Sequence, residues 1–217
     1  MRTILSALTV AAAAATASHA GVTYPWANFD SIGTAWTDAG DEYAYHISNS
    51  DSFSGPTVYT FSEYGTAPGY SSSATVGVEH NSTLTGTGFT LTGKAYGYVS
   101  DDYGYAACYA TGEALTELSF TLDTNSRVTI SGSLGIGGTI APTAYSNYFE
   151  IRNSAGSVVT SASGVASINY SGRLRAGTYT LYVSSSVLNE INFSGGDVYE
   201  SAFATYSVNF KAVPVRR

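Results

Sequence analysis

The chain has a single cysteine, Cys108, among its 217 residues. A lone thiol excludes an intramolecular disulfide, so the core must stabilise the fold by itself, which a chain of this length allows. The neighbours Ala106, Ala107 and Ala110 are small, which favours close packing. We therefore expect Cys108 to be a buried apolar side chain and not a thiol that pairs between chains.

Charged side chains are also scarce. They make up 12% of the sequence, about half the usual share, and the net charge is −7 with no cluster of Lys and Arg. Such a chain repels phosphate backbones, so nucleic acid is excluded as a partner. The chain has 18 Tyr and 9 Phe, whereas disordered chains are poor in aromatic residues. We therefore expect a folded domain.

Histidine is nearly absent beyond residue 20, where only His46 and His80 remain. Serine hydrolases need a base beside the nucleophile, and no G-x-S-x-G motif occurs. Transition-metal sites need clustered His and Cys. The local acidic clusters, Asp38–Glu42 and Asp101–Asp102, do not match a calcium loop, and we interpret them as turn residues. The sequence predicts no catalytic residue, metal site or cofactor.

The one long apolar run is at the N-terminus. Ile4–Ala17 follows Arg2 and precedes Ser18-His19-Ala20, which is the pattern of a secretory signal peptide cleaved after Ala20. A retained membrane anchor is the alternative, although a span needs about 20 apolar residues. We expect residues 1–20 to be a helical signal peptide, and the mature chain to be secreted or held at the cell surface without a transmembrane helix.

Apolar residues do not recur with a helical period after residue 20. They alternate with polar residues instead, which predicts half-buried strands. The clearest sets are Leu118/Phe120/Leu122, Val128/Ile130, Phe149/Ile151, Tyr179/Leu181/Val183 and Tyr206/Val208/Phe210. Many short strands without crossover helices predict an all-β, antiparallel β-sandwich or jelly roll.

Turns and domain limits follow from glycine, proline and serine. Asn153–Gly156 predicts a tight hairpin, residues 63–73 predict a loop, and Gly135–Gly138 predicts a flexible turn because no helix or lysine follows it to form a phosphate loop. We expect a single domain over residues 21–212, best defined over 84–212, with a tail at 213–217. Two domains meeting near residues 65–80 are the alternative.

Five segments between Leu91 and Pro214 form a recognisable series: Leu118–Leu122, Arg127–Leu134, Phe149–Gly156, Gly172–Leu181 and Tyr206–Phe210. In this series the stretch resembles exported bacterial β-sandwich proteins of the PEP-CTERM-associated type, common in planctomycete-like genomes. Residues 176–181 are also similar to bacterial pre-peptidase C-terminal domains, which are accessory sandwiches without catalysis. Val213–Arg217 lacks the Glu-Pro and the apolar helix of the PEP-CTERM sorting tail, so the resemblance implies release from the cell more than anchoring.

Aromatic residues suggest what the protein does. Exposed Tyr and Trp rings on a sheet stack on sugars or on other proteins, although tyrosine is also common in ordinary strands. The candidate binding residues are Trp26, Trp36, Tyr96, Tyr98, Tyr103, Tyr105 and Tyr109. The favoured function is a non-catalytic structural role in the envelope or matrix, with a polysaccharide or matrix protein as partner.

Two alternatives remain open. One is a carbohydrate- or polymer-binding module that uses the exposed Tyr and Trp rings. The other is a glycan-active hydrolase, which needs two carboxylates across a cleft. Candidate carboxylates for such a pair are Glu63, Glu79, Glu113, Glu117, Glu150 and Glu200.

Overall fold

The computed structural model describes residues 21–38, 42–68, 72–102, 107–139, 142–192 and 197–215. The predicted signal peptide and the last two residues of the tail lie outside these ranges. The described residues form twelve strands. Their bounds are β1 (Val22–Asp38), β2 (Glu42–Phe53), β3 (Val58–Pro68), β4 (Ser72–Thr85), β5 (Gly88–Asp101), β6 (Ala107–Leu122), β7 (Ser126–Gly138), β8 (Ala144–Asn153), β9 (Val158–Ser163), β10 (Ala166–Leu174), β11 (Gly177–Asn192) and β12 (Val198–Pro214).

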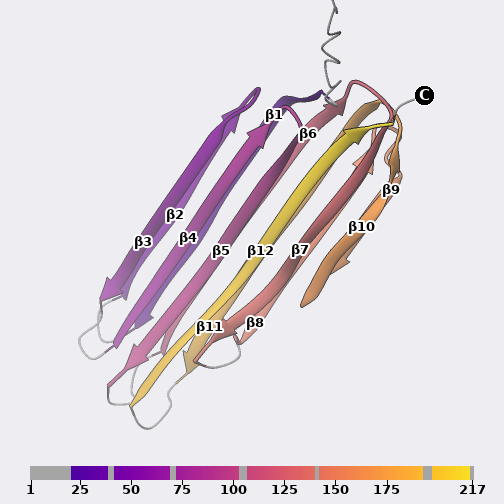
Figure 1. Ribbon diagram of the computed structural model, residues 1–217. Coiled ribbons are helices and arrows are strands. Elements are labelled where there is room, and N and C mark those ends of the chain that lie inside the picture. The colour runs from indigo at the N-terminus through magenta and orange to yellow at the C-terminus, as the bar shows by residue number, and fades with distance from the viewer. Residues whose placement is uncertain are drawn as a thin grey trace, which may run out of the picture.

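The strands form two six-stranded antiparallel sheets that pack face to face (Figure 1). Sheet A has the order β2-β1-β6-β11-β8-β9, and sheet B has the order β10-β7-β12-β5-β4-β3. Strands β5 to β12 alone have the strand order of a jelly roll, with β5, β12, β7 and β10 facing β6, β11, β8 and β9. The prediction of an all-β antiparallel sandwich is confirmed.

The first four strands widen this jelly roll. Strands β1 and β2 extend sheet A beside β6, and β4 and β3 extend sheet B beside β5. Each added pair is a hairpin, and the connection from β2 to β3 passes from one sheet to the other. Both sheets therefore run without interruption from the N-terminal to the C-terminal half of the chain.

The alternating sequence positions form the core, as expected. Phe120, Ile130, Leu181 and Val208 are each at most 1% exposed. Successive strand residues point to opposite faces, so every second residue of these strands lies between the sheets. The apolar rows read from the sequence are the buried rows of the structure.

The core differs along the length of the strands. Near the start of β1 it contains stacked aromatic rings, and Phe89 and Phe210 lie parallel with their centroids 4.8 Å apart. Toward the other end a separate buried cluster consists of Ala95, Val187, Ala202 and Ala204. The small side chains allow close approach: the amide of Asn189 on β11 reaches across the sandwich and donates to the carbonyl of Glu200 at 3.2 Å.

Two local predictions were wrong. Residues 63–68 lie in β3 and residues 72–73 in β4, where the sequence predicted a loop. Gly135–Gly138 lies in β7, where the sequence predicted a turn. Aromatic rings explain both errors, because a ring from the facing sheet covers Gly65 and a ring from a neighbouring strand covers Gly137. A Cβ at Gly65 would overlap the ring of Tyr45, and one at Gly137 would overlap the ring of Phe203.

Other local predictions are confirmed. Residues 154–157 connect β8 to β9 in a tight hairpin, and Gly156 has φ 79°, a conformation that favours glycine. Cys108 is 1% exposed and its burial raises the pKa of the thiol to about 11. The thiol is therefore neutral at physiological pH and packs as an apolar group. In the part of the chain that the structure describes, no helix could cross a membrane.

Candidate functional site

The structure separates the predicted aromatic residues onto opposite faces of the sandwich. Trp26, Trp36 and Tyr109 lie on the outer face of sheet A, where Trp36 and Tyr109 stack with their ring centroids 5.4 Å apart. Tyr96 and Tyr98 lie on the outer face of sheet B. The predicted candidates therefore do not form one surface.

Tyr103 and Tyr105, the remaining two candidates, lie outside the described residues.

The outer face of sheet B carries a group of aromatic rings, the aromatic platform, made of Tyr64, Tyr96 and Phe203. Their positions are opposite one another on β3, β5 and β12, with Gly77 between the first two. The ring of Tyr64 lies over Gly77 and meets Tyr96 edge to face, with centroids 6.3 Å apart. Because Gly77 has no side chain, the ring of Tyr64 lies flat against the sheet and its outer side is exposed to solvent.

Lys94 joins two rings of this platform. Its Nζ lies 5.4 Å from the centroid of Tyr96 and 5.2 Å from that of Phe203. A cation at this range is attracted by both ring faces. Burial is the main cause that raises the pKa of Tyr96, followed by the nearby Tyr98, so the hydroxyl of Tyr96 stays protonated at neutral pH. The platform thus combines flat apolar surface with one positive charge.

Three shallow depressions continue from the platform along β4, β5 and β12. Their volumes are about 280, 280 and 200 Å³. The first and second share Asn81 and Thr92, and the second and third share Thr83 and Thr90, so the three form one trough. From Lys94 to Gly88 the trough follows seven residues of β5, about 20 Å of strand.

The floor of this sheet B trough is mostly polar and uncharged, with the charged side chains of Glu79 and Lys94 near the platform and of Lys211 at the far end. Its side chains point outward because the intervening residues of each strand face the core. Within the described residues, most of these amides and hydroxyls have no side-chain hydrogen bond, so they are available to a ligand. The floor residues without a side-chain hydrogen bond are Asn81, Thr83, Thr90, Thr205, Ser207 and Asn209.

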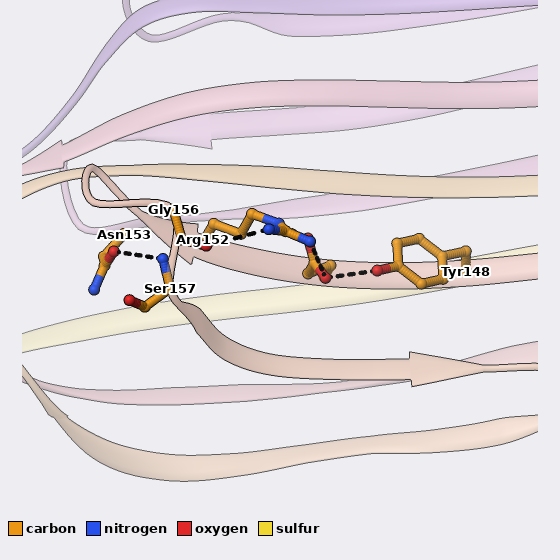
Figure 2. Close-up of polar contacts among 6 residues, drawn as sticks. Tyr148, Arg152, Asn153, Gly156 and Ser157 are labelled. Carbon is orange, nitrogen blue, oxygen red and sulfur yellow. Dashed lines mark hydrogen bonds and ion pairs between the residues drawn. The ribbon is translucent and has the colours of Figure 1, made fainter.

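The outer face of sheet A has a different chemistry. Arg152 binds the carboxylate of Glu150, and Tyr148 donates to the same carboxylate at 2.6 Å (Figure 2). The Arg152 hydrogen bond is the main cause that lowers the pKa of Glu150, and the bond to Glu150 raises the pKa of Tyr148. Arg152 also donates to the carbonyl of Gly156 at 3.1 Å, which ties this group to the β8–β9 hairpin. The polar groups of Tyr148, Glu150 and Arg152 therefore bind one another and the hairpin.

A polar network lies between the sheets. His80, 1% exposed, contacts the hydroxyl of Tyr206 through Nδ1 at 3.0 Å and the carbonyl of Asp30 through Nε2 at 3.0 Å. Thr116 contacts the same Tyr206 hydroxyl at 2.7 Å. Burial is the main cause that lowers the pKa of His80. This histidine is a buried link between the sheets.

The six candidate carboxylates are divided between the two outer faces and the space between the sheets, and two of them, Glu117 and Glu150, flank Tyr182 of β11. Glu113, Glu117 and Glu150 are on the outer face of sheet A. Glu79 is on the outer face of sheet B and, among the described residues, is the carboxylate that lines the sheet B trough.

Glu63, the fifth of these carboxylates, accepts a hydrogen bond from Tyr45 across the two sheets, and Glu200 lies on the β12 side that faces the core. Asp102, one of the predicted turn acids, accepts a hydrogen bond from Tyr199. Among the described residues no group of three or more His, Cys, Asp and Glu could hold a metal ion.

Sequence reasoning missed Tyr64, Phe203 and the whole polar floor. Only the strand register reveals that residues far apart in sequence, such as Asn81 and Asn209, share one face. A signal does exist in the outward positions Thr83, Thr85, Thr90 and Thr92, which alternate with core residues on both sides of a two-residue turn.

The fold and the site together define an all-β jelly-roll sandwich with an open polar trough on one sheet. No family model and no curated protein matches the chain. The VP2 subviral particle of infectious bursal disease virus is 11% identical over 92% of this chain and 68% of its own, with a TM-score of 0.20. A second structure, of the Gx strain of infectious bursal disease virus, is 10% identical over 94% of this chain and 68% of its own, also with a TM-score of 0.20. Likenesses at this level carry no argument about function.

Proposed function

We propose that this protein is a non-catalytic, secreted or cell-surface β-sandwich that contributes to the envelope or extracellular matrix by binding an extended polysaccharide along the sheet B trough. The observation that supports the proposal is the continuity of the aromatic platform with a polar floor. The platform offers flat rings at one end, and the floor offers unpartnered amides and hydroxyls for about 20 Å beyond it.

Each part of this surface suits a sugar chain. Sugar rings have apolar C–H faces that pack on aromatic rings, and hydroxyls that exchange hydrogen bonds with Asn, Thr and Ser. Small-molecule sites are usually concave and enclose most of the ligand, whereas this trough is shallow and open. A long chain compensates for weak contacts at each unit by making many of them, so the geometry favours a polymer over a single sugar.

Removing the platform is expected to weaken polymer binding. In Tyr96→Ala and Phe203→Ala, we expect the dissociation constant for a bound polysaccharide to rise about tenfold or more, because an aromatic anchor at an interface contributes about 1–2 kcal/mol. Affinity electrophoresis or calorimetry on a panel of purified polysaccharides measures this effect.

The matched controls are Trp36→Ala and Tyr109→Ala, which remove a stacked aromatic pair from the opposite face. They are expected to leave the affinity unchanged. Equal losses in both pairs of variants, or no binding to any polysaccharide by the wild-type chain, would overturn the proposal. Circular dichroism of each variant checks that the fold is retained.

A further inference from the structure

The charges of this acidic protein are separated between its two outer faces. Among the described side chains, the outer face of sheet A carries one cation, Arg152, and six carboxylates: Asp30, Asp38, Glu113, Glu117, Glu150 and Glu190. The strands of sheet B carry one outward carboxylate, Glu79, and four outward cations: Lys94, Arg127, Arg173 and Lys211. One further carboxylate, Asp102, follows β5 and accepts a hydrogen bond from the outward Tyr199. The face with the trough is therefore the positive one.

Three of these cations lie together where the trough ends. Arg127 on β7 and Arg173 on β10 are direct cross-strand partners, and both are exposed. Lys211 on β12 is opposite Thr129, two residues along β7 from Arg127, and it lines the last depression of the trough. Diagonal neighbours of this kind are within reach of long side chains.

Nothing in the described part of the protein neutralises this group. The ion pair found there is Arg152 with Glu150, on the opposite face. Like charges that are directly opposite on a sheet destabilise it, so the Arg127–Arg173 pair costs stability in the free protein. An anion bound between the two guanidinium groups removes that cost, because guanidinium binds carboxylate, sulfate and phosphate oxygens in pairs.

We propose that Arg127, Arg173 and Lys211 form an anion site, and that the polymer bound along the sheet B trough is an acidic polysaccharide with carboxylate or sulfate groups. This inference rests on the proposed function, since the same chain that lies in the trough reaches Lys211. The trough favours a polysaccharide over a membrane, because its polar floor would contribute nothing to a flat lipid surface.

The test compares a polyuronate with its own carboxyl-reduced, neutral form. We expect the polyuronate to bind wild-type protein at least tenfold more tightly, and this advantage to fall as salt is raised from 50 to 500 mM because salt screens exposed charges. In the double variant Arg127→Gln/Arg173→Gln the advantage is expected to disappear while the neutral form binds as before. Arg152→Gln, on the other face, is the matched control.

A second readout separates this role from a structural one. Arg173→Gln removes a like-charge contact, so its thermal midpoint at low salt is expected to stay equal to or rise above that of wild type while its affinity for polyuronate falls. Equal binding of both polymer forms, or full polyuronate affinity in the double variant, contradicts the anion site alone. No binding of either form contradicts the proposed function. Arginine-dependent binding to anionic vesicles or to DNA without binding to polyuronate also overturns the inference.

A separate observation concerns the start of the fold. The backbone nitrogen of Gly21 lies 2.9 Å from Oδ1 of Asp123, and the backbone nitrogen of Asp123 donates to the carbonyl of Gly21 at 3.1 Å. A Cβ at position 21 would overlap the Asp123 carboxylate in its present position, so a larger residue there would displace this side chain. We infer that cleavage after Ala20 creates an α-ammonium group at Gly21 that pairs with Asp123 and fastens β1 to the β6–β7 turn.

The pH dependence of the mature chain tests this pairing. A carboxylate partner raises the pKa of the α-amino group above its unfolded value of about 7.7–8.0, so the stabilisation is complete below pH 7.5 and is lost as pH rises toward 10. We expect the thermal midpoint of the Gly21 chain to fall over this range more than that of its N-acetylated form or of Asp123→Asn. Parallel profiles for all three, or an exported chain that mass spectrometry shows to start elsewhere, would refute the inference.

Discussion

Replacing Phe120 by alanine is expected to lower the free energy of unfolding by about 3–5 kcal/mol. Phe120 is 0% exposed and touches both sheets: its ring stacks on Tyr179 of β11 at 5.5 Å and meets Phe89 of β5 at 5.5 Å and Phe210 of β12 at 4.8 Å. The variant loses these contacts and leaves a cavity that long paired strands cannot close. Urea unfolding followed by circular dichroism measures the change.

Phe203→Ala provides the comparison at equal side-chain volume. Phe203 lies on the outer face of sheet B and covers Gly137, so its removal deletes contacts on one side only. We expect a loss of about 1 kcal/mol or less for this variant, since surface substitutions have small effects. A Phe120→Ala protein as stable as Phe203→Ala would mean that the ring cluster between the sheets does not hold them together.

Mild acid is expected to destabilise the fold through His80. The neutral imidazole satisfies every contact: Nε2–H donates to the carbonyl of Asp30, Nδ1 accepts from Tyr206, and Tyr206 accepts from Thr116. Protonation would place a second N–H opposite the Tyr206 hydroxyl and a charge among the rings of Phe29, Tyr59 and Phe61. The folded state therefore resists protonation.

The direction of the pH effect follows from the lowered pKa of His80. The unfolded chain binds a proton near pH 6.5 and the folded chain only at lower pH, so the free energy of unfolding is constant above that value and falls below it. The slope approaches about 1.4 kcal/mol per pH unit. Urea titrations between pH 5 and 7.5 measure it, within a window above the range in which the carboxylates titrate.

Two histidine variants make this prediction specific. His80→Leu is expected to lose the slope below pH 6.5, whatever its stability at neutral pH. His46→Gln is expected to keep the slope, because His46 lies on the exposed face of β2, where its Nδ1 contacts Thr34 at 3.1 Å. A slope that survives in His80→Leu would assign the acid sensitivity to other groups.

The sequence predicted the second half of the fold well. Alternation at Leu118–Leu122 and at Tyr206–Phe210 identified rows that the structure buries, because a strand with one face in a core must alternate. The early strands were harder to read. Strand β1 buries Ser31, Gly33 and Thr37 between the sheets, so its inner row is not apolar and the usual pattern is lost.

The predicted turn at Gly135–Gly138 was wrong for a related reason. In most chains a run such as Gly135–Gly138 marks a turn, but here rings from neighbouring strands lie over several strand glycines and supply the missing side-chain contact. The pairs include Tyr64 with Gly77, Tyr206 with Gly93 and Phe203 with Gly137. Such pairs depend on strand register, which composition does not contain.

The sequence predicted the type of binding residue, exposed aromatic rings, but not the surface on which the candidate site lies. Tyr96 and Tyr98 lie on the face that carries the trough, while Trp36 and Tyr109 stack together on the opposite face. Threonine and asparagine on an outer face look like ordinary solvated residues until the register aligns them. The separation of charge between the faces has the same origin, because Arg127 and Arg173 are 46 positions apart and become neighbours only through pairing of β7 with β10.

Both ends of the described range, Gly21 and Val215, lie at the same end of the sandwich. Gly21 contacts Asp123, and the backbone nitrogen of Val215 donates to the carbonyl of Asn125 in the same turn (Figure 1). An attachment through either terminus, whether to a cell or to a sensor chip, would therefore hold the molecule by one end of its strands. Because the trough follows β5, a polymer bound in it would run along the strands from the attached end toward the opposite end.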